Sequence, residues 1–348
     1  MSLGIDIGKH SIKIVEIQKT NDTIQLKNAD SLNTFNDMKL FDLEKLNNSQ
    51  IIASIQDLCK KMNINPKKMK QIVSSLPSDL ADVRQITTLD LPDDELTISL
   101  ELEAKKHIPL DGTDTIIDYH HLGANKSELD KIDVLLVATT KSKIKEHSEL
   151  IKGCGFKPGI FDADSVAIAN IYQHSSNLPT EGADVILNIG NSITNLIVWG
   201  ENSNFFTRNI EISGNNFTKE ISRQLSLNYE EAESLKFEKG VNVFENINDD
   251  AAENTGISIE KKTIFNDFTE DIRKTLRFYM KNNNQSFFNT FYLCGGSSQL
   301  PGLKEFISSK LNVKVKILNP LNNINSELAI DDVAKYTLAL GLALRGLE

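Results

Sequence analysis

The chain has 348 residues, of which 40% are hydrophobic and 25% charged, and its formal net charge is −10. This length and composition predict a globular protein with enough apolar residues for two domains, or for one large domain with an insertion. The acidic balance argues against a general nucleic-acid-binding protein, because phosphate binding normally needs a basic surface.

The cysteines and the N-terminus indicate the compartment. Cys59, Cys154 and Cys294 lie far apart and form no CxxC pair, so they predict neither a disulfide framework nor a zinc site. No segment reaches the length of a membrane span, and Asp6 interrupts the first apolar run, unlike in a signal peptide. We therefore expect reduced thiols in a cytoplasmic protein that reaches a membrane only through a partner.

The first part of the chain reads as a sheet with one helix. Two strands over 3–7 and 11–17 form a hairpin, and a third strand follows near 24–32. Ser49 is the expected N-cap of the next helix, and a buried strand over 71–77 ends at a proline.

A segment of different character spans 78–160. A short strand, "VRQITTL", leads into an acidic helix over 93–109, and two further strands cover 115–122 and 132–140. A helix over 141–155 then ends at a glycine. This order predicts a small α+β insertion with a sheet of its own.

The remainder returns to the mixed pattern of the first part. A helix over 164–174 precedes "SSNLPTEG", the expected linker over 175–182, and then come strands, two helices near 215–238 and a polar loop over 240–258. In the long helix over 265–279, the spacing of the aromatic residues indicates a core face rather than a binding surface. The chain ends with a strand, a helix, a strand and a helix over 290–296, 297–311, 314–318 and 333–346.

An internal repeat connects the two halves. "GIDIGKHSIKIVEI" (4–17) matches "ILNIGNSITNLIVW" (186–199), with Asp6 over Asn188 and Gly8 over Gly190. Each half therefore begins with the same glycine hairpin and continues with strands and helices, which predicts a duplicated α/β architecture.

The hairpins suggest a phosphate site. A glycine after a strand lets the backbone approach a ligand closely, and N–H groups at such a turn can hold phosphate oxygens. Two turns facing one cleft could hold a single polyphosphate from both sides. Asp6 would then hold Mg²⁺ through water, and Lys9 or Lys13 would balance the phosphate charge.

A third element supports a nucleotide. "LCGGSSQLPGL" (293–303) reads as a buried strand, a Gly-Gly turn and a helix, which would leave free N–H groups beside a nucleobase or sugar. Singly, each element is also explained as an ordinary turn. Together and in this order, the three elements indicate a nucleotide-binding cleft.

These motifs resemble the actin-like ATPase superfamily and, within it, the PilM family of type IV pilus assembly proteins, which is related to the cell-division protein FtsA. The resemblance extends through "LELEAKKHIPL", "VLLVATT", "FTRNIEISGNNFTKEISRQL", "YEEAESLK" and "ALGLALRG". It implies an actin-like, ribonuclease H-like duplicated α/β fold with two lobes around a nucleotide cleft and an FtsA-type inserted subdomain. The implied parts are the first lobe over 1–77, the insertion over 78–160, a return over 161–182, the second lobe over 183–330 with a helical subdomain at about 214–262, and a final helix over 331–348 that packs on the first lobe.

The resemblance also implies roles for individual residues. ATP phosphates would contact Gly8, Lys9, Ser11, Lys13, Gly190, Asn191, Ser192 and Thr194. The ribose and base would contact Gly214, Asn215, Glu233, Lys236, Gly295, Gly296 and Ser297. Asp6 would lie near Mg²⁺.

Some readings stay open. Glu233 and Lys236 also fit an ordinary solvated helix face, and Asp164, near Asp162 where relatives enter a cleft-side helix, is better explained as an N-cap. Many relatives carry aspartate where this chain has Asn188, and an amide attracts Mg²⁺ less and cannot act as a base. We therefore expect ATP binding with slow or no hydrolysis, and of the candidates Asp6 and Asn188 neither is assigned as catalytic.

The implied partner is PilN, a single-span membrane protein. Its cytoplasmic N-terminal peptide would lie between the first lobe and the insertion, and would connect this protein to PilO and indirectly to the assembly motor ATPase, as in twitching motility. The protein would be a cytoplasmic scaffold at the inner membrane that contacts no nucleic acid. A ring or filament of copies is left open.

Two other classes use the same fold. A sugar-type kinase would need a catalytic aspartate and usually a longer chain, and the altered second hairpin counts against it. An FtsA-like filament protein would need a C-terminal amphipathic helix, whereas "LRGLE" directly follows the last expected core helix.

Overall fold

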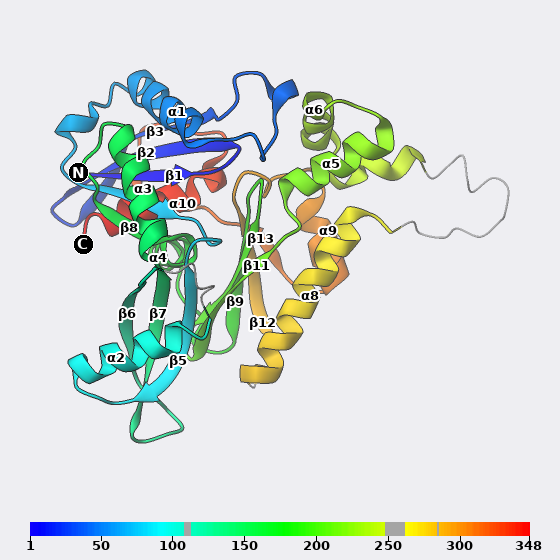
Figure 1. Cartoon of the computed structure of the whole chain (residues 1–348). Coiled ribbons are helices and arrows are strands. Elements are labelled where there is room, and N and C mark those ends of the chain that lie inside the picture. Colours follow the sequence, from blue (N-terminus) through cyan, green and yellow to red (C-terminus); the bar gives the residue numbers. More distant parts are fainter. Residues whose placement is uncertain (108–112, 248–261, 284) are drawn as a thin grey trace.

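The computed structural model describes residues 1–107, 113–247, 262–283 and 285–348. Two large lobes, each built on one sheet, stand side by side, and a smaller sheet extends below the first lobe (Figure 1). Residues 108–109 of the expected acidic helix and 248–258 of the expected polar loop lie outside the described residues.

The sheet of the first lobe has the order β14-β3-β2-β1-β4-β8. Strands β1, β2 and β3 are antiparallel neighbours, whereas β4 and β8 continue parallel to β1. The strands are β1 (Ser2–Ile7), β2 (Ser11–Thr20), β3 (Thr23–Asn33), β4 (Ile72–Leu76), β8 (Ile160–Ala163) and β14 (Asn325–Ser326).

The sheet of the second lobe repeats this arrangement in the order β11-β10-β9-β12-β13. Again three consecutive strands, β9, β10 and β11, are antiparallel neighbours. Strands β12 and β13 lie on the other side of β9 and run parallel to it. The strands are β9 (Ala183–Ile189), β10 (Thr194–Gly200), β11 (Ser203–Ile210), β12 (Phe288–Cys294) and β13 (Val315–Ile317). The repeat predicted from the sequence is therefore a duplication of the whole five-stranded topology.

Helices cover both sheets. In the first lobe these are η1 (Met38–Leu40), α1 (Asn48–Lys61), η2 (Pro66–Lys68), α3 (Lys141–Gly153), α4 (Asp164–Ser175) and α10 (Thr337–Arg345). In the second lobe they are α5 (Gly214–Leu225), α6 (Tyr229–Lys239), η3 (Gly240–Ile247), α8 (Ile264–Asn283) and α9 (Leu303–Leu311). The short helix η4 (Val333–Tyr336) contacts both lobes: Ala334 O accepts from Gly295 N–H, and Tyr336 lies in the core of the first lobe. In the described part of the chain, no helix combines the length and hydrophobicity needed to cross a bilayer.

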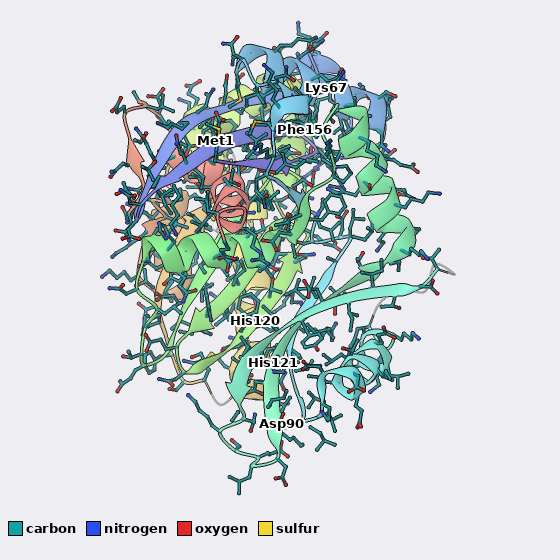
Figure 2. All side chains as sticks on the ribbon, turned by 90° about the vertical axis from the view of Figure 1, so that its left-hand side faces the viewer. Met1, Lys67, Asp90, His120, His121 and Phe156 are labelled. Atoms are coloured by element: carbon teal, nitrogen blue, oxygen red, sulfur yellow. The ribbon has the colours of Figure 1, made fainter. Side chains whose placement is uncertain are left out.

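The small sheet below the first lobe, the inserted sheet, has the order β5-β7-β6. It consists of β5 (Asp82–Leu89), β6 (Thr115–Ala124) and β7 (Lys131–Thr140), and α2 (Asp93–Ala104) packs on one face through Leu96 and Leu100. Figure 2 places His120 and His121 on this sheet and Phe156 in the first lobe above it. Helix α3 follows the insertion in sequence but buries Leu150 and Ile151 with α1 in the core of the first lobe.

Several element boundaries differ from the sequence prediction, and the starts of α1 and α9 have clear local causes or consequences. Helix α1 begins two residues earlier than expected, because Asn47, not Ser49, is the N-cap: its side chain accepts from Gln50 N and the Gln50 side chain accepts from Asn47 N. Helix α9 begins only at Leu303, so no helix N-terminus follows the turn at Gly295 and Gly296.

Candidate functional site

A polar cleft of about 440 Å³ separates the two lobes. The first hairpin lines it on one side, the second hairpin on the other, and the turn after β12 closes the end. Of the predicted residues, those in contact with this cleft are Asp6, Gly8, Lys9, Ser11, Lys13, Asn188, Gly190, Asn191, Ser192, Glu233, Gly295, Gly296 and Ser297.

The two glycine turns have the same local geometry. A Cβ on Gly8 would stand 2.7 Å from the carbonyl oxygen of Ser11, and one on Gly190 would stand 2.8 Å from that of Ile193. In each hairpin the chain therefore folds back on a carbonyl three residues ahead, and only glycine leaves room for it.

The charged groups of the hairpins differ. In the first, Lys13 Nζ donates to Asp6 Oδ2 at 2.9 Å, and both side chains are nearly buried. At the matching cross-strand position of the second hairpin, Asn188 Nδ2 donates to Asn195 Oδ1 at 3.1 Å. One hairpin thus carries an ion pair and the other a neutral amide pair.

The turn after β12 packs tightly under the second hairpin. Gly295 has φ +87°, and a Cβ there would lie 2.6 Å from Asn188 Oδ1. Its N–H donates to Ala334 O, and Ser297 N–H donates to Ile189 O. These two N–H groups are therefore not free for a ligand, in contrast to the expectation, and Gly296 alone leaves open space above it.

Glu233 and Lys236 form a buried network behind the cleft wall. Lys236 is 1% exposed and donates to Glu233 Oε2 at 2.6 Å and to Thr218 Oγ1 at 2.9 Å. Thr218 also donates to Glu233. Burial lowers the pKa of Lys236 and the charge of Glu233 opposes this shift. The reading of Lys236 as part of a solvated helix face is therefore wrong.

Four predicted residues do not line the cleft. Thr194 is fully buried and its hydroxyl donates to Ile212 O. Gly214 and Asn215 begin α5 beneath the second hairpin, where their N–H groups donate to Gly190 O and Asn191 O. Together with Lys236, they support the residues that face the cleft rather than facing it themselves.

Asp164 lines the cleft, and the N-cap reading of this residue is wrong. Ala163 holds the N-cap position of α4, and no side chain caps the helix. Asp164 Oδ1 is buried without a hydrogen-bond partner among the described residues. Burial, and next the charges of Asp6 and Asp79, raise the pKa of Asp164 well above its usual range. In the sequence, an aspartate at the start of a helix fits both an N-cap and a residue that lines a binding cleft, so the sequence alone did not distinguish the two roles.

His10 is a second residue that the sequence analysis missed. It lines the cleft within 3.8 Å of Glu233 Oε1, and its Nε2 has no hydrogen-bond partner in the described residues. Burial lowers its pKa, partly against the charge of Glu233. Asn191 Oδ1 and Ser192 Oγ, on the opposite wall, are also buried without a partner in the described part of the chain. Such unsatisfied groups are costly unless a ligand or water completes them.

The donor set fits Mg²⁺ held through water. Within the described residues, no three His, Cys, Asp or Glu side chains gather closely enough to hold a metal ion directly. Asp6 and Asp164 supply carboxylate oxygens in one cleft, which is the arrangement for an ion that keeps most of its water and binds phosphates.

The duplicated sheets with a polar cleft between their hairpins define a protein of the actin-like ATPase fold. The chain belongs to the family of the type IV pilus assembly protein PilM, whose model matches residues 4–347. Both the fold class and the family resemblance predicted from the sequence are confirmed.

Solved structures agree with this fold. The chain is similar to a PilM-PilN type IV pilus biogenesis complex, with a TM-score of 0.79 and 22% identity over 100% of this chain and 98% of that chain. It is also similar to the ethanolamine utilization protein EutJ from Carboxydothermus hydrogenoformans (TM-score 0.53, 13% identity, 98% and 88% covered) and to MreB5 of Spiroplasma citri bound to ADP (0.51, 11%, 99% and 95%).

Curated relatives match only part of the chain. FtsA proteins from two strains of Staphylococcus epidermidis, RP62A and ATCC 12228, are 26% and 24% identical over 237 and 241 residues. Each alignment covers 59% of this chain and 49% of the FtsA sequence, so the matched part spans about half the length of these relatives.

Proposed function

We propose that this protein is a nucleotide-binding scaffold of the type IV pilus machinery. It binds Mg-ATP in the cleft between the lobes and the cytoplasmic N-terminal peptide of PilN beside the inserted sheet. The observation that carries the nucleotide part is that two glycine hairpins and the Gly295–Ser297 turn line a single polar cleft. PilN binding rests on the family and on the similarity to the PilM-PilN complex.

In this proposal the phosphates lie between the two hairpins. Lys9 and Ser11 would hold them from the first lobe, and Asn191 and Ser192 from the second lobe. When bound, Mg²⁺ would neutralise phosphate charge, and Asp6 and Asp164 would orient its water ligands. The buried pair of Glu233 and Lys236 keeps the base-proximal wall in place.

The titration that tests this function uses purified protein and a synthetic N-terminal peptide of PilN from the same genome, with and without Mg-ATP. Saturable binding of both ligands is expected. Absence of ATP binding would refute the nucleotide part, and absence of peptide binding would refute the scaffold part. Through PilN, the protein would sit at the inner membrane; links to PilO and to the motor ATPase belong to the same proposal.

Slow hydrolysis follows from the neutral amide pair. Asn188 cannot orient the water shell of Mg²⁺ as a carboxylate would, and its amide is already bonded to Asn195. The variant Asn188→Asp should release phosphate from Mg-ATP severalfold faster than the wild type in a continuous phosphate assay. Brisk Mg²⁺-dependent release by the wild type alone would contradict the proposal.

A further inference from the structure

A second cavity in the described part of the molecule lies outside the cleft between the hairpins. This groove of about 640 Å³ runs between the inserted sheet and the second lobe. Strand β5 forms one wall, strand β11 and the end of α8 form the other, and Ser78 and Ser165 lie at its first-lobe end. Figure 1 shows β5 and β11 side by side below the junction of the lobes.

Both walls are strands at the edge of a sheet. Among the described residues, β5 pairs only with β7 and β11 pairs only with β10, so their outer edges face each other across the groove. Side chains already bridge these edges: Phe205 N–H donates to Gln85 Oε1 at 2.7 Å, and Asn209 Nδ2 donates to Ser78 O at 3.0 Å. The backbone edges are therefore not free to accept a further strand, and recognition in the groove depends on the side chains that line it.

The second-lobe wall is aromatic and positively charged. Phe278 on α8 is 53% exposed and stacks with Phe206, with ring centroids 6.3 Å apart, and Arg208 lies over it at 5.8 Å. Lys281 follows Phe278 by three residues, on the same side of the helix. Among the described residues, neither Arg208 nor Lys281 has an acidic partner within 4.0 Å, although the chain carries a net charge of −10.

The acid that lies in the groove does not neutralise this wall. Asp82 on β5 is engaged by Arg84 of the same strand, at 2.5 and 3.0 Å. The groove therefore combines an exposed aromatic ring with uncompensated positive charge. Unpaired cations select acidic side chains in a partner.

From these contacts we propose that the groove binds an acidic segment of a partner protein, which lies along the wall formed by β11 and the end of α8. Carboxylates of the segment pair with Arg208 and Lys281, and an apolar residue packs on Phe278. This site differs from the proposed position of PilN between the first lobe and the insertion, and it does not depend on nucleotide binding.

The test uses an array of overlapping twelve-residue peptides from the cytoplasmic segments of the type IV pilus proteins encoded in the same genome. Binding to the full chain is measured by fluorescence polarisation. Acidic peptides are expected to bind, and Arg208→Glu should weaken them at least tenfold, whereas Lys152→Glu on α3 should not. Replacement of the Asp and Glu residues of a peptide by Asn and Gln should abolish binding, because it removes the carboxylates that pair with Arg208 and Lys281.

Several outcomes would overturn the proposal. These are the absence of acidic peptide binding to the wild type, equal binding to Arg208→Glu, or binding that survives replacement of the peptide carboxylates by amides. Binding of vesicles containing phosphatidylglycerol in place of peptides, with loss in Arg208→Glu, would assign the surface to lipid instead. Mg-ATP and the PilN peptide are also titrated into Arg208→Glu. These titrations test the proposed function separately, so that a failure of the groove proposal is distinguished from a failure of the proposed function.

Discussion

At the scale of single residues, the first hairpin differs from the second by one ion pair. Asp6 and Lys13 face each other across β1 and β2, nearly buried, at the edge of the cleft. A carboxylate in this position would be costly alone, and the lysine compensates it. In the proposed Mg-ATP complex, Lys13 would turn to the phosphates and release Asp6 to the water shell of Mg²⁺.

We expect Asp6→Asn to lose the Mg²⁺-dependent part of ATP affinity, about tenfold or roughly 1.4 kcal/mol. Titration calorimetry with ATP, in the presence and absence of Mg²⁺, measures the difference. Asp30→Asn is the matched control, because Asp30 pairs with Lys61 at 2.7 Å on β3, outside the cleft. An unchanged Mg²⁺ dependence in Asp6→Asn would place the metal elsewhere.

A second residue, His147, should make stability depend on acid pH. His147 of α3 is buried, its Nε2 lies 2.9 Å from Ser74 Oγ, and burial lowers its pKa to about 4. Between pH 6.5 and about 4, the unfolded chain binds a proton that the folded chain does not. The free energy of unfolding should therefore fall as the pH falls, by roughly 2 kcal/mol between pH 7 and pH 5.

The variant His147→Gln should remove this contribution, so that urea unfolding at the two pH values differs less than in the wild type. His120 is exposed on β6, and His120→Gln should leave the pH dependence unchanged. If His147→Gln kept the full acid sensitivity, other groups would be responsible for it.

At the scale of elements, hydrophobic patterns located most helices and strands because each has one buried face. The aromatic stripe of α8 is core, as predicted, with Phe265, Phe268 and Tyr279 fully buried. Helix boundaries were harder to predict, because two nearby residues can each act as the N-cap and only the folded geometry selects one of them. The short strands β8 and β14 gave no usable signal, because their pairing comes from distant segments.

The cap of α1 can be tested directly. Asn47→Ala should lower the free energy of unfolding by about 1 kcal/mol, because it breaks the reciprocal bonds with Gln50. Ser49→Ala, two residues into the exposed first turn, should change it by less than about 0.5 kcal/mol. Urea denaturation compares the two, and a larger loss in Ser49→Ala would restore the original reading.

At the scale of the whole molecule, the repeat in the sequence predicted the shared cleft because matched hairpins imply matched sheets. It did not predict Asp164 or His10, whose roles depend on burial from both lobes. It also did not predict the contact between the segment around η1 and α6, which joins the lobes. There Phe41 stacks with His10 and Tyr229, at 5.1 and 4.6 Å between ring centroids.

This aromatic contact should slow the release of nucleotide. Aromatic pairs contribute about 0.5–1.5 kcal/mol, so Phe41→Ala should speed dissociation of a fluorescent ATP analogue roughly two- to tenfold. Lys39→Ala removes only the exposed pair with Glu230 at 3.9 Å and should have little effect. Equal release rates in the wild type and Phe41→Ala would show that the lobes separate without breaking this contact.

The divergence of the two hairpins also has a consequence for orientation. Two identical motifs facing one cavity would offer a ligand with unlike ends two equivalent ways to lie, with a head toward either lobe. The ion pair at Asp6 and Lys13, set against the amide pair at Asn188 and Asn195, removes that degeneracy. The difference between the two hairpins, more than the fold that the two lobes share, would therefore determine which way round a ligand lies in the cleft.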